Sequence, residues 1–163
     1  MLTDREKLQE ALIEAYAMEK GAREFYGRAA GAAYEKAATD GFGELARMEA
    51  EHMDYIRYLY QAIAGQEEPM DIEGFRKAGP EAPEGAIPAA PSGEKAEEFS
   101  FDDDTGAIAE ALKMEAGSFA FYDGMIKKMK GPAMKALVEG LKNLEETHIK
   151  YLKELRLKLG ETP

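Results

Sequence analysis

The sequence predicts an all-α fold, an antiparallel four-helix bundle in which a long crossover joins the second and third helices. Four long stretches carry apolar residues at intervals of three and four, the spacing of one buried helix face. The two ends of the chain repeat each other at an offset of 96 residues. Between them, residues 66–103 contain five of the seven prolines and show little periodicity. A repeated helix pair separated by an irregular connection accounts for all three observations.

Composition limits the class of protein. A chain of 163 residues with 45% hydrophobic content is long enough for one domain with a substantial core. A net charge of −11 argues against nucleic acids and anionic membrane surfaces as partners. We find no apolar run of about 18 residues and no signal-peptide pattern, so we expect a cytoplasmic protein without a membrane partner. The absence of cysteine excludes disulfides and zinc-thiolate sites.

The first helix pair is expected over residues 3–64. Thr3 and Glu6 have the spacing of a capping box that opens the first helix. The Thr-Asp-Gly sequence at residues 39–41 is expected to be the turn, with its aspartate capping a second helix over residues 42–64. Four charged residues of the second helix are assigned to a solvent-facing side: Arg47, Glu51, Asp54 and Arg57.

Residues 65–103 are predicted to be the crossover, with a short helix near residues 70–77. If the two helix pairs meet along their whole length, the second and third helices are parallel, and the chain must travel back about 35 Å. The second pair is then expected over residues 104–160, interrupted at Gly131 and Pro132. A linker between two separately folded pairs is the alternative. We favour one domain over residues 1–163, because neither pair alone covers its buried carboxylates.

Acid and imidazole side chains occur in the same arrangement in both halves. Glu49 and His52 are three residues apart, so on a helix they point the same way and can reach one metal ion. Glu145 and His148 repeat this pair 96 residues later, and the chain contains no other histidine. The pair is weak evidence by itself, but its repetition favours a metal site.

Two further glutamates belong to the repeat. Glu19 and Glu115 stand thirty residues before Glu49 and Glu145, each within an apolar helix stripe. A bare carboxylate buried there would be strongly unfavourable. For one isolated residue, a side chain that reaches solvent from the margin of the stripe is the better interpretation. Four glutamates at duplicated positions favour metal ligation instead.

Helices that carry Glu, Glu-x-x-His, Glu and Glu-x-x-His in this order resemble the rubrerythrin and ferritin-like di-iron family. The resemblance covers both helix pairs and implies a ferritin-like domain that binds two metal ions. Oxygen and imidazole ligands suit iron or manganese. The resemblance implies terminal ligands at Glu19 and Glu115, bridging ligands at Glu49 and Glu145, and one imidazole for each ion from His52 and His148.

The resemblance also implies an oxidoreductase of the peroxidase or ferroxidase type, which reacts with peroxide or dioxygen and acts in oxidative stress. Tyr26 and Tyr122 follow the first and third glutamates by seven residues and return to the same helix face. They are candidate catalytic residues that hydrogen-bond a ligand or a bound oxygen. Alternatively, they are core residues whose hydroxyls bond a neighbouring glutamate.

Two features depart from rubrerythrins. Without cysteine there is no rubredoxin domain, so we expect an external electron donor. Rubrerythrins carry an additional glutamate one turn after the third-helix ligand, where this chain has Ser118. A second class of function therefore stays open, a metal-stabilised helical module for binding or assembly with little turnover. In either case we expect a homodimer.

Overall fold

The computed structural model describes residues 1–90 and 100–160, and every regular element within them is helical. This confirms the predicted all-α ferritin-like bundle. A short α-helix, α3 (Ile72–Ala78), and a 3-10 helix, η1 (Glu84–Ala86), lie between the second and third long helices. The bundle itself consists of four long helices: α1 (Asp4–Ala32), α2 (Lys36–Ala64), α4 (Asp104–Lys128) and α5 (Pro132–Lys158).

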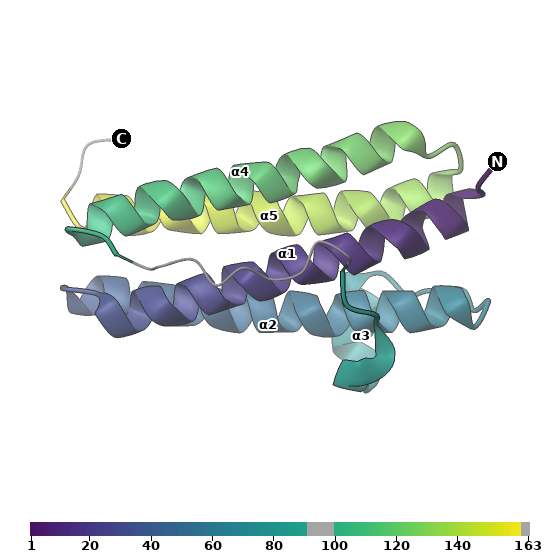
Figure 1. Ribbon diagram of the computed structural model, residues 1–163, viewed down its shortest axis with the longest axis horizontal. Coiled ribbons are helices and arrows are strands. Elements are labelled where there is room, and N and C mark those ends of the chain that lie inside the picture. Colours follow the sequence, from purple (N-terminus) through teal and green to yellow (C-terminus); the bar gives the residue numbers. More distant parts are fainter. Residues whose placement is uncertain (91–99, 161–163) are drawn as a thin grey trace.

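The four long helices form two antiparallel pairs, α1 with α2 and α4 with α5 (Figure 1). α2 ends at the opposite end of the bundle from the start of α4, so these two helices run parallel (Figure 1). Contacts of α1 with α4 and of α2 with α5 join the pairs. The predicted crossover therefore spans the length of the bundle, although its residues 91–99 lie outside the described part. The assignment of residues 1–163 to one domain remains a prediction.

The first turn lies at residues 33–35, earlier than the sequence predicts. The prediction of a turn at residues 39–41 was wrong, because these residues are part of α2. Gly41 is buried, and a Cβ atom there would lie 2.8 Å from a methyl group of Leu155 on α5. The glycine therefore permits close packing of α2 against α5, and tertiary packing outweighs the local turn preference.

Each helix pair holds the turn of the other pair through one aspartate. The Asp104 carboxylate, at the start of α4, accepts backbone hydrogen bonds of 2.9 Å from both residues 34 and 35. The Asp4 carboxylate, at the start of α1, accepts backbone hydrogen bonds of 3.0 and 2.6 Å from residues 130 and 131. These bonds satisfy N–H groups that the helix starts leave without partners.

The core consists of two apolar clusters that are separated along every long helix. One cluster includes Leu12 of α1 and Ile56 of α2, and the other includes Tyr26 and Leu45 of the same helices. The same division separates Ile108 from Tyr122 in α4 and Leu152 from Leu141 in α5. Between the clusters, each helix carries the buried polar residues that the sequence singles out. The bundle therefore surrounds a polar layer with apolar packing on both sides.

The crossover is fixed to α2 by tyrosines and by a buried arginine. The Tyr55 hydroxyl donates to the Met70 carbonyl at 2.9 Å, and the Met70 N–H donates to the Tyr58 hydroxyl at 2.7 Å. The Phe75 ring of α3 lies 5.3 and 5.2 Å from the rings of these two tyrosines. α3 covers Ile72–Ala78, close to the predicted short helix at residues 70–77.

The assignment of Arg57 to the solvent-facing side was wrong. Only 8% of this residue is exposed, because the crossover covers it. Its guanidinium donates hydrogen bonds to the Ala82 carbonyl at 3.1 Å, to the Tyr16 hydroxyl at 2.9 Å and to the Asp54 carboxylate. Within residues 1–90 and 100–160, none of the helices combines the length and hydrophobicity that a membrane span requires.

Candidate metal centre

The polar layer at the middle of the bundle receives side chains from all four long helices. α1 and α4 each contribute one glutamate, and α2 and α5 each contribute a glutamate and a histidine one helical turn apart. Each of these residues is at most 3% exposed. The layer consists of Glu19, Glu49, His52, Glu115, Glu145 and His148.

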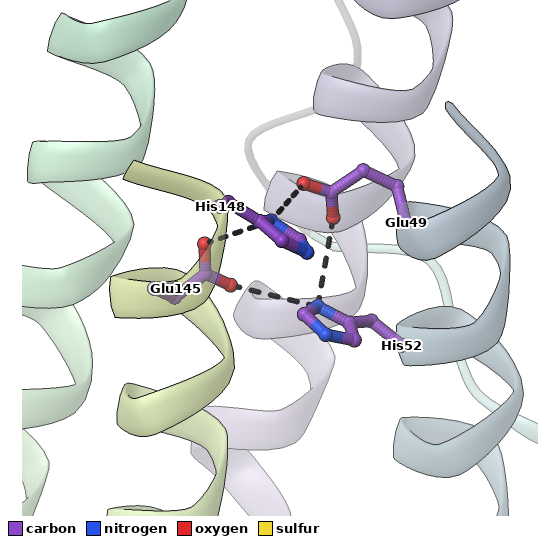
Figure 2. Close-up of side chains that lie close together, drawn as sticks. All are labelled: Glu49, His52, Glu145 and His148. Atoms are coloured by element: carbon purple, nitrogen blue, oxygen red, sulfur yellow. Dashed lines mark ion pairs between the residues drawn. The ribbon is translucent and has the colours of Figure 1, made fainter. Parts of the chain in front are cut away.

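His52 faces three carboxylates from three different helices. Its Nδ1 atom lies 3.5 Å from Glu19 Oε2, 3.7 Å from Glu49 Oε2 and 3.7 Å from Glu145 Oε1. Figure 2 shows the contacts with Glu49 and Glu145, which approach the imidazole from opposite sides of the site. The first imidazole therefore shares one space with three acidic oxygens.

His148 has the equivalent surroundings in the second half of the repeat. Its Nδ1 atom lies 2.9 Å from Glu49 Oε1, 3.3 Å from Glu115 Oε1 and 3.8 Å from Glu145 Oε2. Glu49 and Glu145 therefore face both histidines, each through two different oxygens (Figure 2). Glu115 takes the place beside His148 that Glu19 takes beside His52.

Three of these six separations, at 2.9, 3.3 and 3.5 Å, are close to those between ligands of one metal ion, and the other three, at 3.7–3.8 Å, are slightly longer. Ligand atoms at about 2.1 Å from one ion lie about 3.0–3.5 Å from each other when they meet at 90–110°. The two imidazole rings stack with centroids 4.6 Å apart and planes 14° from parallel. Ligand atoms of Glu49, His52, Glu145 and His148 all lie within 4.8 Å of one another. Glu19 lies beside His52 and Glu115 beside His148, so all six predicted ligands lie in one buried layer.

Unsatisfied polar atoms at this layer support the same interpretation. Both oxygens of Glu49 and of Glu145, Glu115 Oε2 and His148 Nδ1 are buried and have no hydrogen-bond partner among the residues that the structure describes. Buried polar groups without partners are unusual and unfavourable. Carboxylates and imidazoles are donors that iron and manganese accept. The residues present therefore fit a metal centre.

The electrostatics divide the four glutamates into two kinds. Burial, followed by the charge of Glu19, raises the pKa of both Glu49 and Glu145 well above the ordinary value. Burial also acts to raise the pKa of Glu19 and Glu115. Close polar contacts with neighbouring glutamates and with a histidine outweigh burial there and hold the pKa of both below the ordinary value. Without metal, the two shared carboxyls therefore retain protons most readily.

The two candidate catalytic tyrosines bind Glu115 and Glu19 across the bundle. The Tyr26 hydroxyl donates to Glu115 Oε1 at 2.5 Å, and the Tyr122 hydroxyl donates to Glu19 Oε1 at 2.9 Å. Burial and the adjacent carboxylate raise the pKa of each tyrosine well above its ordinary value, so both hydroxyls keep their protons. Sequence spacing placed each tyrosine near the glutamate of its own helix and did not reveal this crosswise pairing.

The remaining predicted position, Ser118, is half-buried on α4. Sequence reasoning missed Arg57 and its partner Tyr16, which join the crossover to the bundle. Predicting this pair requires knowing which helix face the crossover covers. The crossover has no periodic pattern of apolar residues, so its sequence does not indicate that face.

A four-helix bundle with a buried layer of glutamates and histidines defines a carboxylate-type candidate metal protein. A model of the rubrerythrin family matches residues 10–156, and the chain therefore belongs to the rubrerythrin family. Members of this family bind a di-iron centre. No curated protein and no solved structure matches the chain.

Proposed function

We propose that this protein is a di-iron oxidoreductase that reduces peroxide or dioxygen with electrons from a separate donor. One observation carries the proposal: Glu49 and Glu145 each face both histidines, while Glu19 and Glu115 each face one. This division is the one expected of two bridging and two terminal ligands. The carboxylate and imidazole ligands suit iron or manganese, and membership of the rubrerythrin family favours iron.

The residues have distinct tasks in this proposal. Glu49 and Glu145 would hold both ions, and one histidine and one of the glutamates Glu19 and Glu115 would complete each ion. Two ferrous ions would supply both electrons for reducing peroxide to two molecules of water, which also consumes two protons. Tyr26 and Tyr122 orient the terminal carboxylates and hold protons at their hydroxyl oxygens. The apolar clusters on either side of the layer restrict water.

The proposed reaction needs an electron donor. We propose that the electrons come from a separate donor molecule, because these 163 residues contain no cysteine for a rubredoxin-type iron site. We also propose a homodimer in the cytoplasm. Ferroxidase activity, in which ferrous ion is the substrate, is the closest alternative reaction at the same site. A metal-stabilised binding module is the alternative without turnover.

The test begins with protein loaded anaerobically with ferrous ion. We expect one equivalent of peroxide to oxidise about two ferrous ions per chain, and chemical reduction to restore the ferrous state with the metal retained. A ferrous-specific chelator measures the first step, and metal analysis after gel filtration measures the second. Protein that binds two ions but is not oxidised by peroxide would contradict the oxidoreductase and favour the binding module.

A further inference from the structure

A cavity lies between α1 and the crossover, and none of the six residues of the metal layer lines it. Its volume is about 690 Å³, within the range of about 300–1,000 Å³ that is usual for small-molecule sites. α1 contributes one wall, the crossover after η1 contributes the other, and a methionine of α2 lies between them. The residues that line the cavity include Tyr16, Lys20, Arg23, Met53, Ile87 and Pro88.

The walls of this cavity are held in place by buried groups. Met53 is 4% exposed and Ile87 is 7% exposed, so both are packed into the protein as well as lining the cavity. Arg57 donates to the Ala82 carbonyl of the crossover and to the Tyr16 hydroxyl of α1. One buried guanidinium therefore joins α1 to the crossover, five residues before the wall begins at Ile87.

The charge of the cavity is opposite to that of the chain. The protein has 32 acidic and 21 basic residues, yet the cavity is lined by two cations, Lys20 and Arg23, and by one acid, Glu24. In the second half of the repeat, an offset of 96 places alanine at residue 116 and phenylalanine at residue 119. The bundle can therefore be built without these cations, which distinguish the first helix pair from its duplicate.

We propose that this cavity binds an amphipathic organic anion, a small molecule with a flat apolar body and a carboxylate, sulfonate or phosphate group. Ile13 and Pro88 provide the accessible apolar surface, to which the largely buried Met53 and Ile87 add little, and Lys20 and Arg23 provide the charge for the anionic group. This site is separate from the metal ligands, and its binding does not depend on the proposed reaction.

The cavity nevertheless adjoins the candidate metal centre. Lys20 directly follows Glu19 on α1, and Met53 directly follows His52 on α2. Consecutive helical residues point about 100° apart, so the ligand and the metal layer share the same two helix segments. A bound anion is therefore in a position to alter the metal centre through the backbone of α1 and α2.

The test uses anilinonaphthalene sulfonate, a fluorescent amphipathic anion, with the full chain in its metal-loaded form. We expect saturable binding of about one probe per chain. The double change Lys20→Glu and Arg23→Glu should raise the Kd at least about tenfold, because it replaces two attractive charges with two repulsive ones. Ala17→Trp should also block binding, because Ala17 lines the cavity and the larger side chain would fill it.

Matched changes on the other helix pair serve as controls. The double change Lys113→Glu and Lys150→Glu reverses the same charge at exposed positions, and Ala116→Trp adds the same ring to the exposed face of α4. These variants should keep the wild-type Kd, and circular dichroism verifies that every variant is folded. Binding that does not saturate near one probe per chain would overturn the proposal. Equal effects in the cavity and control variants would do so as well.

Discussion

The Tyr26 hydroxyl on α1 donates a hydrogen bond of 2.5 Å to Glu115 Oε1 on α4. The Tyr122 hydroxyl on α4 returns the same kind of bond to Glu19 on α1, at 2.9 Å. Each terminal glutamate is therefore positioned by a tyrosine of the opposite helix pair. The geometry of the candidate metal centre depends on how the two pairs dock, so docking and metal affinity should be linked.

Tyr26→Phe tests this link. The change removes only the hydroxyl that orients Glu115, so two ions should still bind at saturation, but the affinity should fall about 10–100-fold. Without metal, losing this buried hydrogen bond should lower the free energy of unfolding by about 1–2 kcal/mol. Metal titration and chemical denaturation provide the two measurements.

Tyr55→Phe is the matched control for Tyr26→Phe. Tyr55 is equally buried, but its hydroxyl donates to the Met70 carbonyl of the crossover and not to a metal-layer residue. We expect a similar loss of stability and an unchanged metal affinity. Equal metal affinities in the two variants would show that the crosswise bond does not position a ligand.

Removing the metal should make stability depend on pH. The raised pKa values of Glu49 and Glu145 mean that the folded metal-free protein binds more protons than the unfolded chain above about pH 4.5. Its stability should therefore fall as pH rises from about 5 to 8, and metal binding should release these protons and restore the stability. Melting temperatures of chelated and loaded protein at several pH values provide the measurement.

The double change Glu49→Gln and Glu145→Gln isolates the two carboxyls in that experiment. Glutamine keeps the side-chain volume and does not titrate, so the metal-free variant should lose most of the wild-type decline in melting temperature between pH 5 and 8. If the chelated wild-type protein melts at the same temperature as the loaded protein at neutral pH, the layer does not bind a stabilising metal.

The position of the metal layer was predictable because a short, repeated pattern encodes it. Glu49 and His52 must share a helix face at their spacing, and the offset of 96 residues marks the partners Glu145 and His148. Burial of these residues follows from the apolar stripes on which they lie. The sequence therefore predicted both the helices and the convergence of their polar residues.

The sequence did not predict the position of the first turn or the burial of Arg57, because both depend on contacts between distant segments. Residues 39–41 have turn chemistry, but Gly41 is needed for the approach of α2 to Leu155, more than a hundred residues away. Arg57 has the sequence context of a surface residue and becomes buried because an irregular segment covers it. Local propensity and periodicity contain neither contact.

Asp104→Ala tests the exchange of hydrogen bonds between helix pairs. It leaves two backbone N–H groups of the first turn without their acceptor, so we expect the free energy of unfolding to fall by about 1–2 kcal/mol. Asp102→Ala removes the same charge from an exposed neighbouring position and should have little effect. Chemical denaturation compares the two variants, and equal losses would attribute the effect to charge alone.

The number of metal ions per chain in single variants distinguishes shared from terminal ligands. Glu49 faces both histidines, whereas Glu19 faces only His52. Glu49→Gln should therefore abolish binding of both ions, while Glu19→Gln should leave about one ion per chain. Ser118→Ala should keep about two, because a serine hydroxyl is a poor ligand for these ions. Metal analysis of the purified variants gives the number of ions per chain.

Stability without metal separates a ligand role from a structural one. Burial and the charge of Glu19 raise the pKa of Glu49, so this carboxyl disfavours the metal-free fold as pH rises above the ordinary value. Replacing it with glutamine should therefore leave the metal-free protein at least as stable as the wild-type protein at neutral pH. A loss of stability, or lost helicity in the metal-free variant, would show that Glu49 is needed for the fold. Full occupancy by two ions in Glu49→Gln would refute its role as a bridge.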